Sequence, residues 1–202
     1  MREIGDKVFV SIQMPPPSRK RSANPAPVLA SNGVAHQGAP IVPASYEPEP
    51  EQYYGGAGCF GENSTVMISG IQTPINQVKV GDKVATSEGF AIVQAIAKID
   101  RPNKNLLMFP SGLTITKRHP VRIQGQWQTP MSLGLIEVPN PANCVYNLVL
   151  DRCHVLLVNN IECITWGHNL QEEGVKHAYY GSKAIIEDLK EMSGWPMVTI
   201  SG

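Results

Sequence analysis

The sequence lacks an excess of charge of either sign and contains no long hydrophobic run. Lys and Arg together number 17, and so do Asp and Glu, in a chain of 202 residues. Proteins that bind nucleic acids or membrane surfaces commonly carry a basic excess, so we predict neither kind of partner. No apolar run is long enough for a membrane-spanning helix, so we expect no membrane insertion.

The N-terminus lacks the charged-then-apolar plan of a secretory signal. We therefore expect a cytoplasmic protein, in which a framework of structural disulfides is not favoured. The four cysteines of the chain are accordingly expected to be reactive, buried or metal-bound. No cofactor is predicted.

Residues 15–57 lack a sustained helical or alternating pattern and are rich in Pro, Gly, Ala and Ser. This composition is typical of a disordered or polyproline-like linker. Before it, residues 7–12 (KVFVSI) form one possible strand. The chain is therefore divided into a low-complexity segment, residues 1–57, and a folded domain, residues 58–202.

The folded domain has short β-rich runs separated by turn residues such as Gly70, Gly89 and Gly125. Many short strands at this spacing predict a mainly β domain rather than alternating strands and helices. Near the C-terminus, Ser182 can cap a helix whose apolar residues recur at helical spacing until Ser193-Gly194. The expected strands are 65–69, 79–80, 83–86, 91–99, 106–109, 113–116, 121–123, 145–150 and 155–158.

Cys59 lies where the linker meets the β domain, directly after Gly58. This is an unusual place for a core cysteine, but it suits a nucleophile that attacks the preceding peptide bond. Attack of the thiol on the Gly58 carbonyl would exchange the amide for a thioester, an N-to-S acyl shift. Glycine leaves the carbonyl open and tolerates a twisted backbone. The reaction also needs a proton-transfer group and donors for the oxyanion.

Thr116 and His119 have the spacing Thr-x-x-His at the end of an expected strand. A histidine near its ordinary pKa can protonate the leaving amide nitrogen. A nearby hydroxyl can orient the imidazole ring or polarise the amide. The spacing alone is a weak pattern, because a strand threonine followed by a surface histidine explains it equally well.

Four blocks of the sequence, in order, resemble those of Hint autoprocessing domains, the superfamily of inteins and hedgehog C-terminal domains. The blocks are Gly58-Cys-Phe with Asn63–Val66, then Val78–Val84, then Leu113–His119, and finally Val145–Leu148 with His154 and Val158–Ile161. The arrangement looks most like the Vint-type Hint domains of proteins that carry a von Willebrand A domain, although no A domain is recognisable here. The resemblance implies a compact all-β Hint fold with a short C-terminal helix, and single-turnover autocatalytic cleavage.

By position, the resemblance implies that Cys59 is the nucleophile of the Gly58–Cys59 bond and that Thr116 and His119 assist the acyl shift. The N-terminal segment is then the substrate, and Cys59 releases it as a thioester. Water or an unidentified nucleophile resolves the thioester.

Three further residues match functional positions of the superfamily. His154 resembles an intein histidine that assists later proton transfers, and Asp100 resembles a hedgehog aspartate that acts as base for the second nucleophile. Cys163 falls where hedgehog domains place a second cysteine, so it is expected to pair reversibly with Cys59 or to support it. Each also has a plain structural interpretation: a core histidine, a surface turn and a buried strand cysteine.

The sequence departs from inteins at the end of the pattern. His168-Asn169 is followed by Leu170, which is not a nucleophile. Protein splicing is therefore not expected. A long sterol-recognition segment, as hedgehog domains carry, is also absent after the pattern, so cholesterol is not supported as acceptor.

Two other functions compete with self-processing. Cys144, Cys153, His154, Cys163 and His168 fall within a short stretch, and thiolate with imidazole suits a structural zinc ion. The absence of a Cys-x-x-Cys pair or a close pair of histidines argues against this. The second alternative is a Hint-derived interaction module that has lost its activity.

Overall fold

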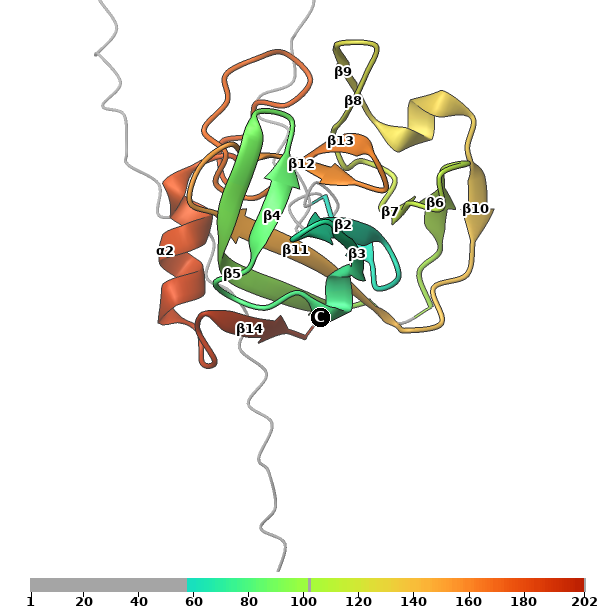
Figure 1. The fold of residues 1–202 in the computed structure, drawn as a ribbon. Helices are drawn as coiled ribbons and strands as arrows, with labels where there is room; N and C mark the ends of the chain where they lie inside the picture. Colours follow the sequence, from blue (N-terminus) through green and yellow to red (C-terminus); the bar gives the residue numbers. More distant parts are fainter. Residues whose placement is uncertain (1–57, 102, 202) are drawn as a thin grey trace, which may run out of the picture. The chain divides into compact units, whose positions relative to one another are not determined.

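The structure is a computed structural model of the chain, and it describes residues 58–101 and 103–201. The possible strand at residues 7–12 and the predicted linker lie outside the described residues. The described part is mainly β with one α-helix near its C-terminal end, which confirms the predicted fold class (Figure 1). Its strands are β1 Phe60–Gly61, β2 Thr65–Ile68, β3 Ile71–Pro74, β4 Lys83–Thr86, β5 Gly89–Asp100, β6 Leu106–Met108, β7 Thr114–Ile115, β8 Val121–Ile123, β9 Gln126–Gln128, β10 Ile136–Val138, β11 Cys144–Leu150, β12 Val155–Val158, β13 Ile161–Ile164 and β14 Met197–Ile200.

The expected strands at 83–86, 121–123 and 155–158 are confirmed as β4, β8 and β12. The strand expected at 79–80 is wrong. Lys79 instead begins a turn in which its backbone N–H donates to Asp82 Oδ2 at 2.7 Å, the side-chain hydrogen bond that aspartate forms in turns. Strands such as β3 and β9 escaped the sequence analysis because their residues, IQTP and QWQ, are few and largely polar.

Strand β5 joins the two parts of the sheet. Its first residues pair with β4, where Lys83 faces Ile92, and its later residues pair with β11, where Cys144 faces Asp100. The strand order is β10-β6-β7-β1-β11-β5-β4-β2-β12-β13-β8-β9. A strand of 12 residues is long enough to serve both parts of the sheet. Its buried side chains contribute to two cores, Val93 and Ile96 to one and Ala95 and Ala97 to the other.

The core consists of two main clusters of buried side chains. The first contains Phe60, Val66, Val84, Leu113, Ile115, Leu148 and Leu156, with others around them. The second contains Cys59, Ala95, Ala97, Val145, Trp166, Ile185, Leu189 and Val198. Cys59 and Phe60 are neighbours in sequence but belong to different clusters, as expected for successive residues of an extended chain, whose side chains alternate in direction.

The predicted helix is confirmed as α2, Lys183–Glu191. The Ser182 hydroxyl caps it by accepting from Ala184 N at 3.3 Å. Ile185 and Leu189 are buried against Val198 of β14 in the second cluster, and α2 lies beside β14 and β5 (Figure 1). Strand β14 follows the helix and pairs in parallel with β5, a pairing that the sequence analysis missed. No helix among the described residues is long and apolar enough to cross a membrane.

We expect Leu156→Ala to lower the free energy of unfolding by about 2–5 kcal/mol, because Leu156 has 0% exposure and its removal leaves a cavity. Ile71→Ala, at a side chain with 68% exposure, is the matched control and should change it by less than about 0.5 kcal/mol. Urea denaturation followed by circular dichroism measures both. Equal losses in the two variants would contradict the placement of the core.

Candidate active site

The Gly58–Cys59 peptide directly precedes β1, which lies between β7 and β11. Phe60 pairs with Ile115 of β7 and with Tyr146 of β11. Both pairings are antiparallel, so one step back along β1 is one step forward along each partner. The register therefore sets Cys59 opposite the residue after Ile115 on one side and opposite the residue after Tyr146 on the other. Those residues are Thr116 and Asn147.

Thr116 forms two hydrogen bonds with the backbone of Cys59. Its Oγ1 accepts from Cys59 N at 3.0 Å, and its own N–H donates to Cys59 O at 3.0 Å. The N–H bound by the hydroxyl belongs to the peptide that joins Gly58 to Cys59. Thr116 has 7% exposure, so water does not compete strongly for these groups.

Asn147 binds the other end of the same peptide. Its Nδ2 donates to the carbonyl oxygen of Gly58, while its Oδ1 accepts from Leu148 N at 2.7 Å. A backbone N–H is only a donor, so the side-chain oxygen must face it, and this turns the amide NH₂ toward Gly58. Asn147 is buried with 1% exposure. The peptide before Cys59 is thus held at both its polar atoms.

The motifs of the sequence do not single out Asn147 as a site residue. A signal was present, because Asn147 stands in the otherwise largely apolar run CVYNLVL of β11. A buried side-chain amide lowers stability unless it is hydrogen-bonded. Its partner on another strand could not be read from the sequence.

His119 packs against the same peptide and is completely buried. Its Nε2 contacts Ile164 O at 2.8 Å, and its Nδ1 is a buried nitrogen. A Cβ atom at position 58 would lie 2.6 Å from Nδ1 and 2.9 Å from Cα of His119. Glycine is therefore required at position 58 for the imidazole ring to approach this closely.

Burial shifts the pKa values of the Cys59 thiol and the His119 imidazole in the directions that favour the neutral form of each group. It raises the pKa of the Cys59 thiol to about 12, and the positive charge of Arg101 opposes this in part. It lowers the pKa of His119 to about 4, although hydrogen bonds to the Ile164 and Cys59 backbones act in the opposite direction. The expectation that His119 keeps an ordinary pKa is therefore wrong, because the ring is fully desolvated.

The neutral state fixes the tautomer of His119. A carbonyl oxygen only accepts, so the contact with Ile164 O requires the proton on Nε2. Nδ1 then carries the lone pair and faces the Gly58 side of the peptide. At neutral pH the ring is a proton acceptor there, and it becomes a donor only after it has taken up a proton.

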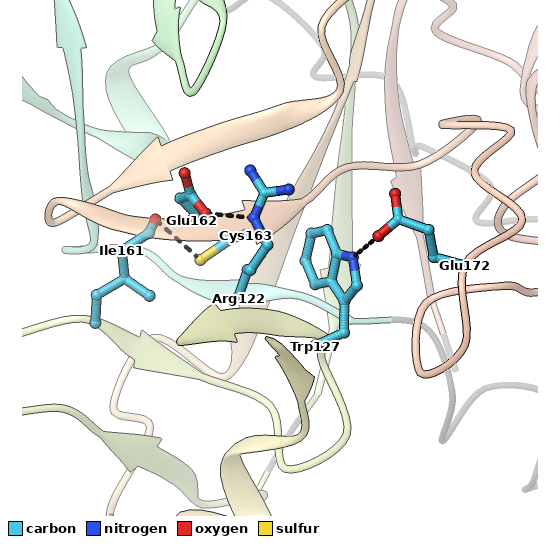
Figure 2. A network of polar contacts seen from close by, with 6 residues as sticks. All are labelled: Arg122, Trp127, Ile161, Glu162, Cys163 and Glu172. Atoms are coloured by element: carbon cyan, nitrogen blue, oxygen red, sulfur yellow. Dashed lines mark hydrogen bonds and ion pairs between the residues drawn. The ribbon is translucent and has the colours of Figure 1, made fainter. Parts of the chain in front are cut away.

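Cys163 packs in the first core cluster, whereas Cys59 lies in the second. Its Sγ lies 3.4 Å from Ile161 O (Figure 2), and burial raises the pKa of its thiol well above the ordinary range. These contacts agree with the structural interpretation, a buried strand cysteine. All four cysteines lie in the described part of the chain, and the structure holds them as thiols.

A polar network covers the surface around Cys163. Arg122 Nε donates to Glu162 Oε2 at 2.5 Å, and its guanidinium lies 5.3 Å from the ring centre of Trp127. Trp127 Nε1 in turn donates to Glu172 Oε2 at 2.8 Å (Figure 2). The ion pair links β8 to β13, and the Trp127–Glu172 hydrogen bond links β9 to the segment after β13.

The contacts of Asp100 and His154 also lie away from the Gly58–Cys59 peptide. Asp100 Oδ2 accepts from Ser201 Oγ at 2.9 Å at the end of β5. His154 is half-buried after β11, and its backbone oxygen accepts from Thr165 N at 3.0 Å. Burial lowers the pKa of His154, opposed by Asp151. The structure thus brings together Cys59, Thr116 and His119 of the six predicted residues.

The residues described here contain no group of three or more His, Cys, Asp or Glu side chains arranged to hold a metal ion. The zinc alternative, which needed Cys144, Cys153, His154, Cys163 and His168 to converge, gains no support from the geometry. These residues lie on separate strands and loops, and Cys163 faces the core.

A mainly β domain that holds the peptide bond before a cysteine between two strands is a domain of the Hint type. The sequence model of the Vint family, described as a Hint domain, matches residues 58–200, and the chain belongs to this family. No curated protein matches the chain.

Solved intein structures resemble the domain. The gp41-1 intein has 14% identity and a TM-score of 0.45 over 54% of this chain and 99% of that chain. A DnaB intein from Synechocystis sp. PCC 6803 has 15% identity and a TM-score of 0.43 over 54% of this chain and 99% of its own.

We expect the imidazole of His119 to titrate near pH 4 in the Cys59→Ala chain. The unfolded chain takes up this proton near pH 6.5, the ordinary pKa of histidine. Protonation of His119 therefore favours the unfolded chain. Its effect on the free energy of unfolding is absent above pH 6.5, and the stability falls as the pH drops from 6.5 toward 4. NMR of the ring and urea midpoints across this window measure both effects. His119→Gln is the control and should have a shallower pH dependence. A midpoint near 6.5 would refute the burial of this ring.

Proposed function

We propose that the domain processes its own chain, with Cys59 attacking the carbonyl carbon of Gly58 in an N-to-S acyl shift. The thioester is then resolved by water or another nucleophile, and the N-terminal segment is released. The observation that carries the proposal is that the carbonyl and the N–H of this one peptide are bound by Asn147 and Thr116. Membership of a Hint family supports the same reaction class.

Asn147 supplies the oxyanion donor in the proposed reaction. The Gly58 oxygen gains negative charge as the sulfur attacks, and the donor already points at this atom in the resting state. A fixed donor in a site without water stabilises such charge strongly, because it need not reorient during the reaction. The bond from Leu148 N to Oδ1 prevents the side-chain amide from turning over.

His119 transfers the proton from sulfur to nitrogen. The thiol is neutral at rest because of its pKa of about 12, so it must lose its proton as it attacks. Nδ1 of neutral His119 accepts this proton and passes it to the amide nitrogen of Cys59 as the C–N bond breaks. The thiol and the amide become a thioester and an amine with no net change in protons.

Thr116 controls the direction of the amide hydrogen. Its hydroxyl accepts the N–H of Cys59, which orients the nitrogen while its lone pair develops away from that hydrogen. The lone pair is then available to the imidazolium. We therefore assign Thr116 a positioning role.

The same burial favours a second candidate, an interaction module that does not cleave. Cys59 has 2% exposure, and a thiol with a pKa of about 12 has almost no thiolate at neutral pH. A domain whose thiol stays protonated has the same structure as an active domain. Only the rate of cleavage at the Gly58–Cys59 bond distinguishes the two. Incubation of the purified full chain with hydroxylamine, followed by mass spectrometry, separates the two.

In that experiment we expect a fragment that ends at Gly58, and Cys59→Ala should abolish it because no thioester can form. Cys144→Ala is the matched control, a cysteine that is also buried, with 5% exposure. It should cleave at close to the parent rate. An intact parent chain under all conditions would sink the proposal and leave the inactive module.

Asn147→Ala should slow cleavage by about 10²–10³-fold, as expected when one oxyanion donor is removed. Asn140→Ala is the control, since Asn140 is likewise buried and donates to a backbone oxygen, Cys144 O, at 3.1 Å. It should change the rate by less than about tenfold, by way of stability alone. Fragment mass against time gives both rates. Equal slowing of both variants would remove Asn147 from the reaction.

A further inference from the structure

A cavity of about 350 Å³ opens beside Thr116, on the segment after β5 and around the end of β7. The residues of its wall that matter here are Arg101, Lys104, Thr116, Lys117, Arg118 and Glu137. Four of these six are cations and one is a carboxylate. The chain as a whole has a formal net charge of +0, so the concentration of positive charge here does not follow from the composition.

The one carboxylate does not neutralise the wall. Glu137 Oε2 pairs with Lys117 Nζ at 3.0 Å, and this interaction lowers the pKa of Glu137. Among the described residues, no carboxylate forms an ion pair with Arg101, Lys104 or Arg118. Three cations therefore converge on a cavity that has room for a small molecule.

The cavity adjoins the reacting peptide. Thr116 belongs to its wall and also binds the amide of Cys59. Arg101, another residue of the wall, is close enough to Cys59 for its charge to act on the thiol. Cys59 itself is not part of the wall, but two wall residues, Thr116 and Arg101, act on it directly.

We propose that this cavity binds the acceptor that resolves the thioester, and that the acceptor is an amine carrying a phosphate group. This inference rests on the proposed function. Arginine binds phosphate through a planar fork of donors, and the negative charge of a phosphate group matches the cations of this wall. The amine is attached close to the phosphate, since Thr116 of the wall binds the Cys59 backbone.

An amine is the acceptor that the cavity favours. A hydroxyl needs a general base, and the carboxylate of this wall is engaged with Lys117. The cations around the cavity disfavour a further positive charge, so they lower the pKa of a bound amine and increase its nucleophilic form. The amine attacks the Gly58 carbonyl, the C–S bond breaks, and the Cys59 sulfur takes the proton that the amine loses. The product is an amide at Gly58, with no oxidation or reduction.

The test incubates the full-length chain with O-phosphoethanolamine or with ethanolamine at equal concentrations of unprotonated amine. Mass spectrometry measures the rate at which each adduct forms on residues 1–58. We expect the phosphate-bearing amine to react about tenfold faster at low salt, with the advantage shrinking at high salt. Equal rates for the two amines overturn the inference.

Lys104→Glu reverses one charge of the wall at an exposed residue, and Lys190→Glu does the same at an exposed residue of α2 as the matched control. The advantage of O-phosphoethanolamine should fall about tenfold in the first variant and remain in the second. Ethanolamine should react equally in both. An advantage that survives Lys104→Glu removes the cavity from acceptor binding.

Phosphatidylethanolamine vesicles in phosphatidylcholine, compared with soluble O-phosphoethanolamine, distinguish a lipid headgroup from a free molecule as the source of the acceptor. An adduct that forms faster than the ethanolamine adduct, in either arm, supports the inference. Adducts with ethanolamine alone overturn it.

Calorimetry on the Cys59→Ala chain separates failure of this inference from failure of the proposed function. This chain forms no thioester, so binding of O-phosphoethanolamine is measured without chemistry. We expect binding that Lys104→Glu weakens about tenfold. Hydroxylamine cleavage of the parent chain without such binding overturns the acceptor site alone. Binding without cleavage by hydroxylamine overturns the proposed reaction.

Discussion

Phe60 pairs with β7 on one side and, together with Gly61, with β11 on the other, and the site depends on this double pairing of a two-residue strand. The antiparallel register determines which residues lie on either side of Cys59. A shift by one residue would turn every side chain of β1 to the other face. It would also move Thr116 and Asn147 away from the peptide that they bind. The buried aromatic ring of Phe60 opposes such a shift, because it is completely enclosed in the first core cluster.

The electrostatics of the site favour a resting state without charged groups at the peptide before Cys59. Burial keeps both the thiol and the imidazole neutral, so no charged pair has to be desolvated inside the domain. The hydrogen bonds to the peptide are nevertheless already in place. The arrangement therefore combines stable folding with donors aimed at the charge that the proposed reaction develops. A reaction that proceeds once in the lifetime of a chain does not need the exposed, low-pKa cysteine of a multiple-turnover enzyme.

The Gly58–Cys59 peptide has neutral, buried groups on one side and cations on the other, and this difference bears on how the acyl group leaves in the proposed reaction. Asn147 and His119 lie in the buried interior and concern the first step. The cationic wall at Arg101 and Lys104 is open to solvent and concerns the second. In the proposed second step, a charged molecule approaches from this open side without entering the core. Hydrolysis would need only that water replace such a molecule in the cavity.

Local pattern in the sequence determined the β class, three strands at their observed bounds and the helix after Ser182. The resemblance to Hint domains singled out Cys59, Thr116 and His119. Periodicity and capping act over a few residues, so they are legible along the chain. The tertiary structure alone decided that Asn147 faces Gly58, that Cys163 packs in the core, and that β14 pairs with β5. Each of these is a contact between segments far apart in sequence, and a strand's partner is set by how whole faces pack together. The same holds for pKa values: the type of residue was visible in the sequence, but the burial that shifts it belongs to the folded domain.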